Sequence, residues 1–155
     1  MRSHRKSWTE TFRAALVSGT FASLASAAAL SAAGRRELGD PVAPLNGPSQ
    51  WVWGRHAPYR NGFSVRHTVV GYAIHHLSAL MWATFFERAR SPRHPVRAAI
   101  VTSSVACFVD YCCTPERFTP GFEKRLSRRA LFWAYAAVAA GLAASTVLTS
   151  KRERS

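Results

Sequence analysis

The feature that most constrains this chain is residues 66–87, an apolar run with two adjacent histidines near its middle. An α-helix rises about 1.5 Å per residue, so about 20 apolar residues cross the roughly 30 Å hydrocarbon core of a bilayer. Ionisable side chains are costly at that depth and usually face a protein interior or a cavity. His75 and His76 therefore predict a membrane helix whose histidine-bearing side packs against other parts of the protein.

Three further apolar runs complete a pattern of four membrane spans. The chain has 155 residues, which is enough for one domain. We expect an all-α fold, a four-helix integral membrane bundle with a connector rich in Pro and Trp between its first two helices. The single membrane domain covers residues 1–155, and the predicted spans are about residues 14–33, 67–86, 96–113 and 130–149.

The first run has a second interpretation. A basic segment precedes residues 14–33, and Ser31 and Ala33 are small residues near their end, as at the cleavage site of a secretory signal. The run is longer than the apolar region of most signals, which favours an uncleaved helix. In the cleaved alternative, the mature chain begins near Gly34.

Two connector features predict contact with the membrane surface. Trp51 and Trp53 lie in the Pro-rich connector, residues 34–65. Tryptophan rings are stable among lipid headgroups, so the pair is predicted to be interfacial, and the alternative is packing against the end of the bundle. Phe122 and Leu126 lie one helical turn apart, which predicts an interfacial helix that leads into the fourth span.

The net charge of +13 comes from 21 Lys and Arg against 8 Asp and Glu. These basic residues cluster beside the apolar runs, where anionic lipid headgroups lie, and no nucleic-acid motif accompanies them. We therefore expect a bilayer with anionic lipids, and no nucleic acid, as a partner. The two ends of the bundle have nearly equal numbers of basic residues. Those beside the termini and the middle turn lie in shorter segments, which favours both termini in the cytoplasm.

The second and third spans each have a polar stripe at helical spacing. His75 belongs to the first stripe, and Ser103, Cys107 and Asp110 belong to the second. Asp110 is the one acidic residue well inside an apolar run, so its burial requires a partner. We hypothesise that His75 and Asp110 face one interior space and are coupled directly or through Ser103, Cys107 or water. The candidate polar site within the membrane therefore comprises His75, His76, Ser103, Cys107 and Asp110.

This candidate site has two interpretations. A polar contact between helices commonly fixes their register, which is a structural role. The alternative is a proton- or metal-handling site, with His75, Cys107 and Asp110 as three metal ligands. The chain has no CxxC, HxxxH or ExxH spacing and no nucleophile motif. We therefore expect no metal, no cofactor and no catalytic residue.

Small residues recur along the first and fourth spans. Lipid tails give no hydrophobic drive for helix association, so close backbone contact must supply it. We predict that both stripes lie at helix–helix contacts, with each other or across a dimer. The first stripe is Gly19, Ser23, Ala27 and Ser31, and the second is Ala137, Gly141 and Ser145.

Several stretches of the chain resemble one family. They are PLNGPSQWVWG (44–54), GYAIHH (71–76), DYCCTPERFTPGFEKRLSRRAL (110–131) and the last helix. Together they resemble a family of small, uncharacterised proteobacterial inner-membrane proteins over about residues 40–148, and TPGFEKRLSR is the most specific part. The resemblance implies four membrane helices in the bacterial inner membrane, and it implies no activity.

These features predict a non-enzymatic integral inner-membrane protein. Its expected role is an accessory or structural subunit that packs with itself, as a homo-oligomer, or with a larger membrane partner. The alternative is a small transporter, or a redox- or metal-handling membrane protein, that uses His75 and Asp110.

Overall fold

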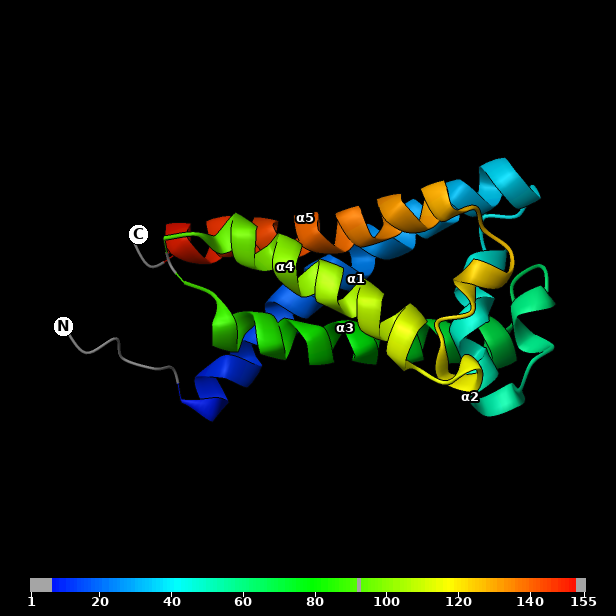
Figure 1. Cartoon of the computed structure of the whole chain (residues 1–155), viewed down its shortest axis with the longest axis horizontal. Coiled ribbons are helices and arrows are strands. Elements are labelled where there is room, and N and C mark those ends of the chain that lie inside the picture. The colour runs from blue at the N-terminus through cyan, green and yellow to red at the C-terminus, as the bar shows by residue number, and fades with distance from the viewer. Residues whose placement is uncertain (1–6, 92, 153–155) are drawn as a thin grey trace.

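The computed structural model describes residues 7–91 and 93–152, and these residues contain helices and no strand. The prediction of an all-α four-helix bundle is confirmed, because four helical segments are long and apolar enough to cross a membrane (Figure 1). The α-helices are α1 (Trp8–Leu38), α2 (Gln50–Trp53), α3 (Val70–Ala89), α4 (Pro95–Phe108) and α5 (Arg128–Arg152).

Two π turns extend the middle helices. The turn η3 (Val65–Val69) leads into α3, and η4 (Val109–Cys113) continues α4. With these turns included, the second and third membrane-length segments agree closely with the predicted spans. A π turn places one extra residue in the helix and is frequent at functional sites, and η4 contains Asp110.

The helices α1 and α5 are longer than their predicted spans, and a polar cap lies at the start of each. The Ser7 hydroxyl accepts the Glu10 amide, and the Glu10 carboxylate accepts the Ser7 amide, which forms a capping box. At the start of α5, the Ser127 hydroxyl accepts the Ala130 amide at 3.2 Å. Glu37, near the end of α1, accepts the Ser127 amide at 2.8 Å and its hydroxyl at 2.7 Å. These bonds join the end of the first helix to the start of the last.

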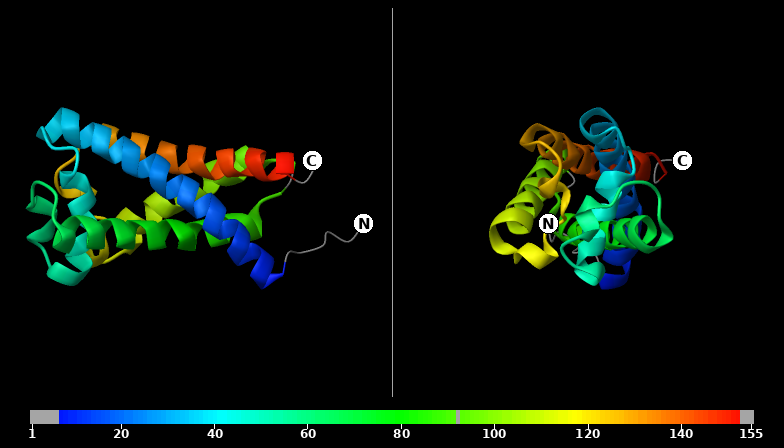
Figure 2. Two further views of the ribbon diagram at one scale, coloured as in Figure 1. Left: turned by 180° about the vertical axis from the view of Figure 1, so that it is seen from behind. Right: turned by 90° about the vertical axis from the view of Figure 1, so that its right-hand side faces the viewer.

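The helix α1 crosses the bundle obliquely (Figure 2). It packs most extensively on α5 and next on α3, whereas α4 packs mainly on α5. The start of α1, the turn between α3 and α4, and the end of α5 lie together at one end of the bundle (Figure 1). Residues 39–64 and 114–127, the two long connectors, lie at the other end, which we call the connector end.

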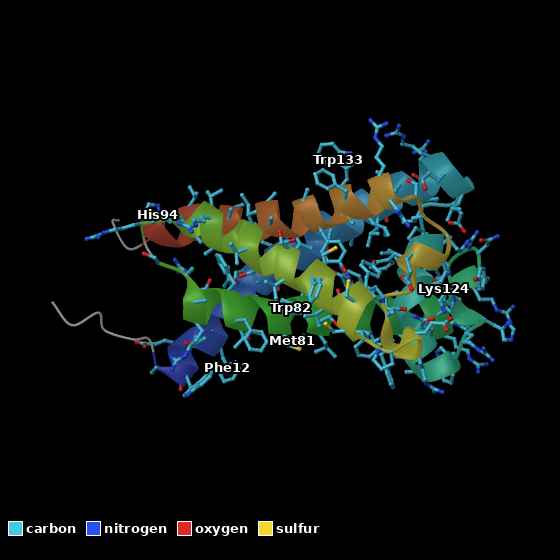
Figure 3. The ribbon with its side chains drawn as sticks, viewed as in Figure 1. Phe12, Met81, Trp82, His94, Lys124 and Trp133 are labelled. Atoms are coloured by element: carbon cyan, nitrogen blue, oxygen red, sulfur yellow. The ribbon has the colours of Figure 1, made fainter. Side chains whose placement is uncertain are left out.

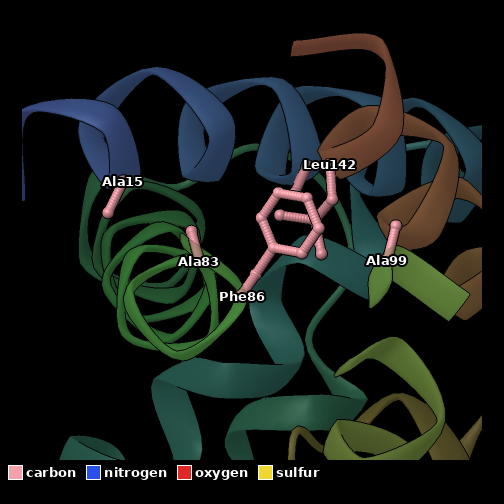
Figure 4. Packing of buried hydrophobic residues seen from close by; sticks show 6 residues of the cluster. Ala15, Ala83, Phe86, Ala99 and Leu142 are labelled. Carbon is pink, nitrogen blue, oxygen red and sulfur yellow. The ribbon is translucent and has the colours of Figure 1, made fainter. Parts of the chain in front are cut away.

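The bundle buries small residues and leaves many large apolar residues on its outside. One core cluster consists of alanines around Phe86 and Leu142, which are both fully buried (Figure 4). Phe12 and Trp133 are more than half exposed and point outward (Figure 3). Among lipid tails, helices associate through close contact of small residues while large apolar side chains face outward. The buried polar residues of α1 are Thr11, Ser18, Ser23 and Ser26.

The second core cluster lies at the connector end and corrects one prediction. Phe122 and Leu126 do not lie on an interfacial helix: they are only 5% and 6% exposed and pack around Leu30 of α1. The surrounding connector forms two short 3-10 turns, and Gly121, at a φ of 82°, lies between them. Phe122 and Leu126 therefore anchor the connector in the core of the bundle.

Gly19 and Gly141, one from each small-residue stripe, lie at contacts with different helices. A Cβ atom on Gly141 of α5 would lie 2.6 Å from the Cα atom of Ala22 in α1. A Cβ atom on Gly19 of α1 would lie 2.9 Å from the Cα atom of Leu80 in α3. The helix α1 therefore presents one face to α5 and another face to α3.

Backbone hydrogen bonds hold the first connector in place. The Asp40 carboxylate accepts the amides of Gly62, Val42 and Ala43 at 2.6, 2.8 and 3.2 Å. These bonds, above all the one from Gly62, lower the pKa of Asp40 below its ordinary value, although partial burial opposes them. The fully buried Asn46 amide donates to the Gly62 carbonyl oxygen at 3.2 Å. The connector is therefore a folded part of the protein.

Candidate functional site

A cavity of about 70 Å³ lies toward the connector end of the bundle. All four long helices and both connectors contribute to its wall, so distant parts of the chain converge on it. Its lining residues are Ser26 and Leu30 of α1; Pro48 and Trp51 of the first connector; Ile74, His75, Ser78, Ala79 and Trp82 of α3; Ala106 and Asp110 of the α4 segment; Phe118, Pro120 and Phe122 of the second connector; and Ala134, Tyr135 and Val138 of α5.

Helical spacing explains why α3 contributes so much to this wall. His75, Ser78 and Trp82 are separated by three and four residues and therefore lie on one face of the helix. They belong to the polar stripe that the sequence predicts. On the facing segment, Ala106 and Asp110 are four residues apart, and the π turn η4 begins between them.

His75 has a hydrogen-bond partner on α1. Its Nε2 atom lies 3.0 Å from the Ser26 hydroxyl oxygen. That hydroxyl also donates to the Ala22 carbonyl oxygen at 2.8 Å. Because a hydroxyl has one proton to donate, this arrangement assigns the proton of the His75–Ser26 bond to Nε2. The imidazole edge also meets Phe122, whose ring centre is 5.9 Å away at an interplanar angle of 75°.

Asp110 has a hydrogen-bond partner on α5. The Tyr135 hydroxyl donates to the Asp110 Oδ2 atom at 2.6 Å. Within the described residues, no Lys, Arg or His side chain forms an ion pair with Asp110. His75 and Asp110 thus line the same cavity, but each forms its hydrogen bond with a different helix. Of the predicted ways in which the two residues could be coupled, a direct hydrogen bond is absent, because each bonds to another residue.

The polar side chains of Tyr111 and Glu123 lie near Asp110. Tyr111, the next residue, packs edge-on against Tyr135 at 5.9 Å. The Glu123 Oε2 atom is buried and has no hydrogen-bond partner among the described residues. The other Glu123 oxygen accepts the Thr119 hydroxyl at 2.6 Å. Neither Tyr111 nor Glu123 lines the cavity, so these atoms lie behind its wall.

The other three predicted site residues lie elsewhere. Ser103 and Cys107 line a separate groove between α4 and α5, and the Ser103 hydroxyl donates to the Tyr135 carbonyl oxygen at 2.6 Å. His76 does not line the cavity, because the next residue along a helix points to another side. Its ring stacks on Tyr72 at 6.0 Å. Within the described residues, no hydrogen bond of Ser103 or Cys107 joins His75 to Asp110, and coupling of the pair through water stays a prediction.

Trp51 and Trp53 pack on the connector end of the bundle, and their contact with the membrane surface stays a prediction. Both rings are partly exposed at the connector end, as expected for residues at a membrane surface. Both also pack: the Trp51 indole donates to the Thr119 carbonyl oxygen at 3.2 Å, and Trp53 donates to that of Arg66 at 2.8 Å. The Arg66 guanidinium lies 4.2 Å from the Trp53 ring centre. Trp51 in addition lines the cavity.

Sequence reasoning missed the partners of His75 and Asp110. Tyr135 is the only tyrosine in the predicted fourth span, and a phenol at that depth needs a hydrogen-bond partner, so this signal was available. Ser26 gave no such signal, because it is one of several serines in the first span. The aromatic contribution of the second connector was hidden by its assignment to the membrane surface.

Within the described residues, no group of three or more His, Cys, Asp or Glu side chains is arranged to hold a metal ion. No protein-family model, curated protein or solved structure matches the chain. The family resemblance is therefore neither confirmed nor contradicted, and the proposals below rest on the geometry.

Proposed function

We propose that this chain is a non-enzymatic, multi-pass protein of the bacterial inner membrane that acts as an accessory or structural subunit. The observation that supports the proposal is the groove between α4 and α5, which has a volume of about 570 Å³. Alanines of α5 form much of its lining: Ala136, Ala139, Ala140 and Ala143. The larger apolar residues Val96, Ile100 and Phe132 also line it.

A transmembrane helix suits this groove. Its alanines recur at spacings of three and four, so they form one small-residue face on α5. Such faces allow two helix backbones to approach closely, which favours association in lipid. The exposed side of α4 next to it is also apolar, with Ile100, Val101 and Val105 about half exposed. The incoming helix belongs to a second copy of this chain or to a larger membrane protein.

A photo-crosslinking residue at position 140 tests the proposal in intact membranes. Ala140 is exposed and lines the groove, so we expect a protein adduct of defined mass. An adduct of twice the chain mass identifies a second copy, and a discrete different mass identifies another membrane protein. Ala73 is the matched control, because it is an exposed alanine on α3 outside the groove.

Two results of that experiment would contradict the accessory role. One is lipid adducts alone at position 140. The other is the same set of protein adducts at positions 140 and 73, since this would show random collision in the membrane. A defined adduct at 140 that is absent at 73 supports the groove as the contact surface.

The cavity favours a second candidate function. His75 and Asp110 come from different helices and line one small space at the connector end. Polar groups that converge inside a bundle of membrane helices often mark the path or the binding site of a solute. This supports a small transporter, or another solute-handling membrane protein, that is built around these two residues.

A further inference from the structure

We propose that the cavity binds a small organic ammonium cation, with Asp110 as its counter-ion and aromatic rings as its walls. This proposal rests on the second candidate function only in that the cation and the transported solute would use the same cavity. Binding of the cation does not require transport. It is independent of the helix contact at the α4–α5 groove.

The charge of Asp110 indicates a cation. A carboxylate in apolar surroundings is costly unless a positive charge or several hydrogen bonds compensate it. Among the described residues, Asp110 receives one hydrogen bond, from Tyr135, and no ion pair. The His75 Nε2 atom is already bonded to Ser26. Asp110 is therefore a partly buried acid that lines a cavity, and no Lys, Arg or His side chain of the described residues forms an ion pair with it.

The walls indicate an organic cation. Six aromatic side chains line the space: Trp51, His75, Trp82, Phe118, Phe122 and Tyr135. Two of their contacts are nearly perpendicular, Trp51 with Phe118 at 89° and His75 with Phe122 at 75°, so these rings form adjoining walls. The face of an aromatic ring attracts cations within about 6 Å, and aromatic cages bind alkylated ammonium groups in this way.

Size narrows the ligand further. The cavity of about 70 Å³ is roughly half the volume of a cavity of about 150 Å³ that holds benzene. It therefore suits a ligand of about three heavy atoms or fewer by the same scaling. Leu30, Ile74 and Val138 supply apolar contacts for an alkyl group. A methylammonium-sized ion has the charge for Asp110 and a methyl group for these contacts.

Methylammonium chloride is the probe for the binding experiment. The full-length protein in nanodiscs is titrated while tryptophan fluorescence is recorded, because Trp51 and Trp82 lie in the wall. Two heavy atoms at the upper limit of ligand efficiency give a Kd no tighter than roughly 6 mM, so the titration extends to about 100 mM. Sodium chloride at equal ionic strength and methanol are the salt control and the neutral control.

We expect saturable binding of methylammonium and at least a tenfold weaker Kd in Asp110→Asn. Glu116→Gln is the matched control, because it removes an exposed carboxylate outside the cavity and should leave the Kd unchanged. Equal binding by wild type and Asp110→Asn would overturn the proposal. So would a linear response without saturation, or saturation with sodium chloride alone.

A measurement on the wild-type protein decides the question if Asp110→Asn does not fold. Irradiation of the aromatic protons in a saturation-transfer NMR experiment should reduce the signal of the methylammonium methyl group. Tetraethylammonium is too large for the cavity, so its addition should not change this reduction of the methyl signal. If no saturation reaches the methyl group, the ion does not sit among the rings and the proposal fails.

Discussion

At the scale of single residues, Asp110 and His75 show what determines the hydrogen-bond partner of a polar residue inside the bundle. The sequence places both on polar stripes, and both line one cavity. Each nevertheless bonds to a residue of a different helix, Tyr135 and Ser26 respectively. Spacing along a helix predicts which way a side chain points, whereas the identity of its partner depends on how the other helices are placed around it.

Asp40 gives a pH-dependent prediction at the same scale. Hydrogen bonds from three backbone amides lower its pKa in the folded protein below the ordinary 3.8. The stabilisation is therefore fully present above pH 3.8 and is lost as the pH falls through the lower, folded-state pKa. Asp40→Asn should lower the free energy of unfolding by about 1–3 kcal/mol at pH 7. The gap to wild type should narrow below about pH 4.

Thermal or denaturant unfolding in detergent across pH 3–8 measures this gap. The control Glu116→Gln removes an exposed carboxylate that pairs with the Lys124 ammonium at 3.4 Å. An ion pair with an exposed partner contributes about 1 kcal/mol or less. A constant difference between Asp40→Asn and wild type at every pH would show that the carboxylate charge does not hold the connector.

At the scale of elements, the contact between α1 and α5 depends on Gly141. Its missing side chain lets α5 approach the backbone of α1 at Ala22. Gly141→Leu should force the helices apart and lower the free energy of unfolding by at least about 1–3 kcal/mol, as overpacking does. Ala144→Leu, at an exposed position on the same helix, is the control and should change little.

Melting curves and the elution volume of the detergent complex report the effect of Gly141→Leu. If Gly141→Leu and Ala144→Leu melt at the same temperature, the two helices have room to spare. The close approach would then be of no energetic consequence.

The elements themselves could be predicted further than the site. Apolar runs identify the four long helices because a membrane span needs a fixed length of apolar chain. They do not reveal the starts of α1 and α5, where Ser7 and Ser127 supply caps, or the end of α1, where Gly39 adopts a left-handed conformation. Phe122 and Leu126 show the same limit. Their helical spacing does not reveal that Gly121, just before them, has a left-handed backbone, or that both side chains pack on Leu30 in the core.

At the scale of the whole molecule, both long connectors lie at one end and the helix ends near the termini lie at the other (Figure 1). This arrangement fits four crossings of a bilayer. We predict that reporter fusions after Gly47 and after Ser155 report opposite sides, with the second in the cytoplasm, because the basic residues near the termini are packed into shorter segments. Alkaline phosphatase and green fluorescent protein fusions measure this.

If the fusions after Gly47 and after Ser155 lie on the same side of the membrane, the four-span arrangement is contradicted. Opposite sides with the Gly47 fusion in the cytoplasm would leave four spans intact and reverse the orientation. A fusion after Arg90, in the turn between α3 and α4, is an internal check and should agree with the fusion after Ser155.

The pairing of α1 with α5 also determines when the protein can assemble. The helix α1 has its largest contact with α5, which is synthesised after it. Glu37 likewise cannot accept its hydrogen bonds until Ser127, ninety residues later, has been synthesised. During synthesis, the face of α1 around Ala22, which packs on α5, must therefore remain in the membrane without that neighbour until α5 has been made. Until then, the insertion machinery or a membrane chaperone would have to cover that face. Misassembly and aggregation are therefore most expected while the protein is being inserted.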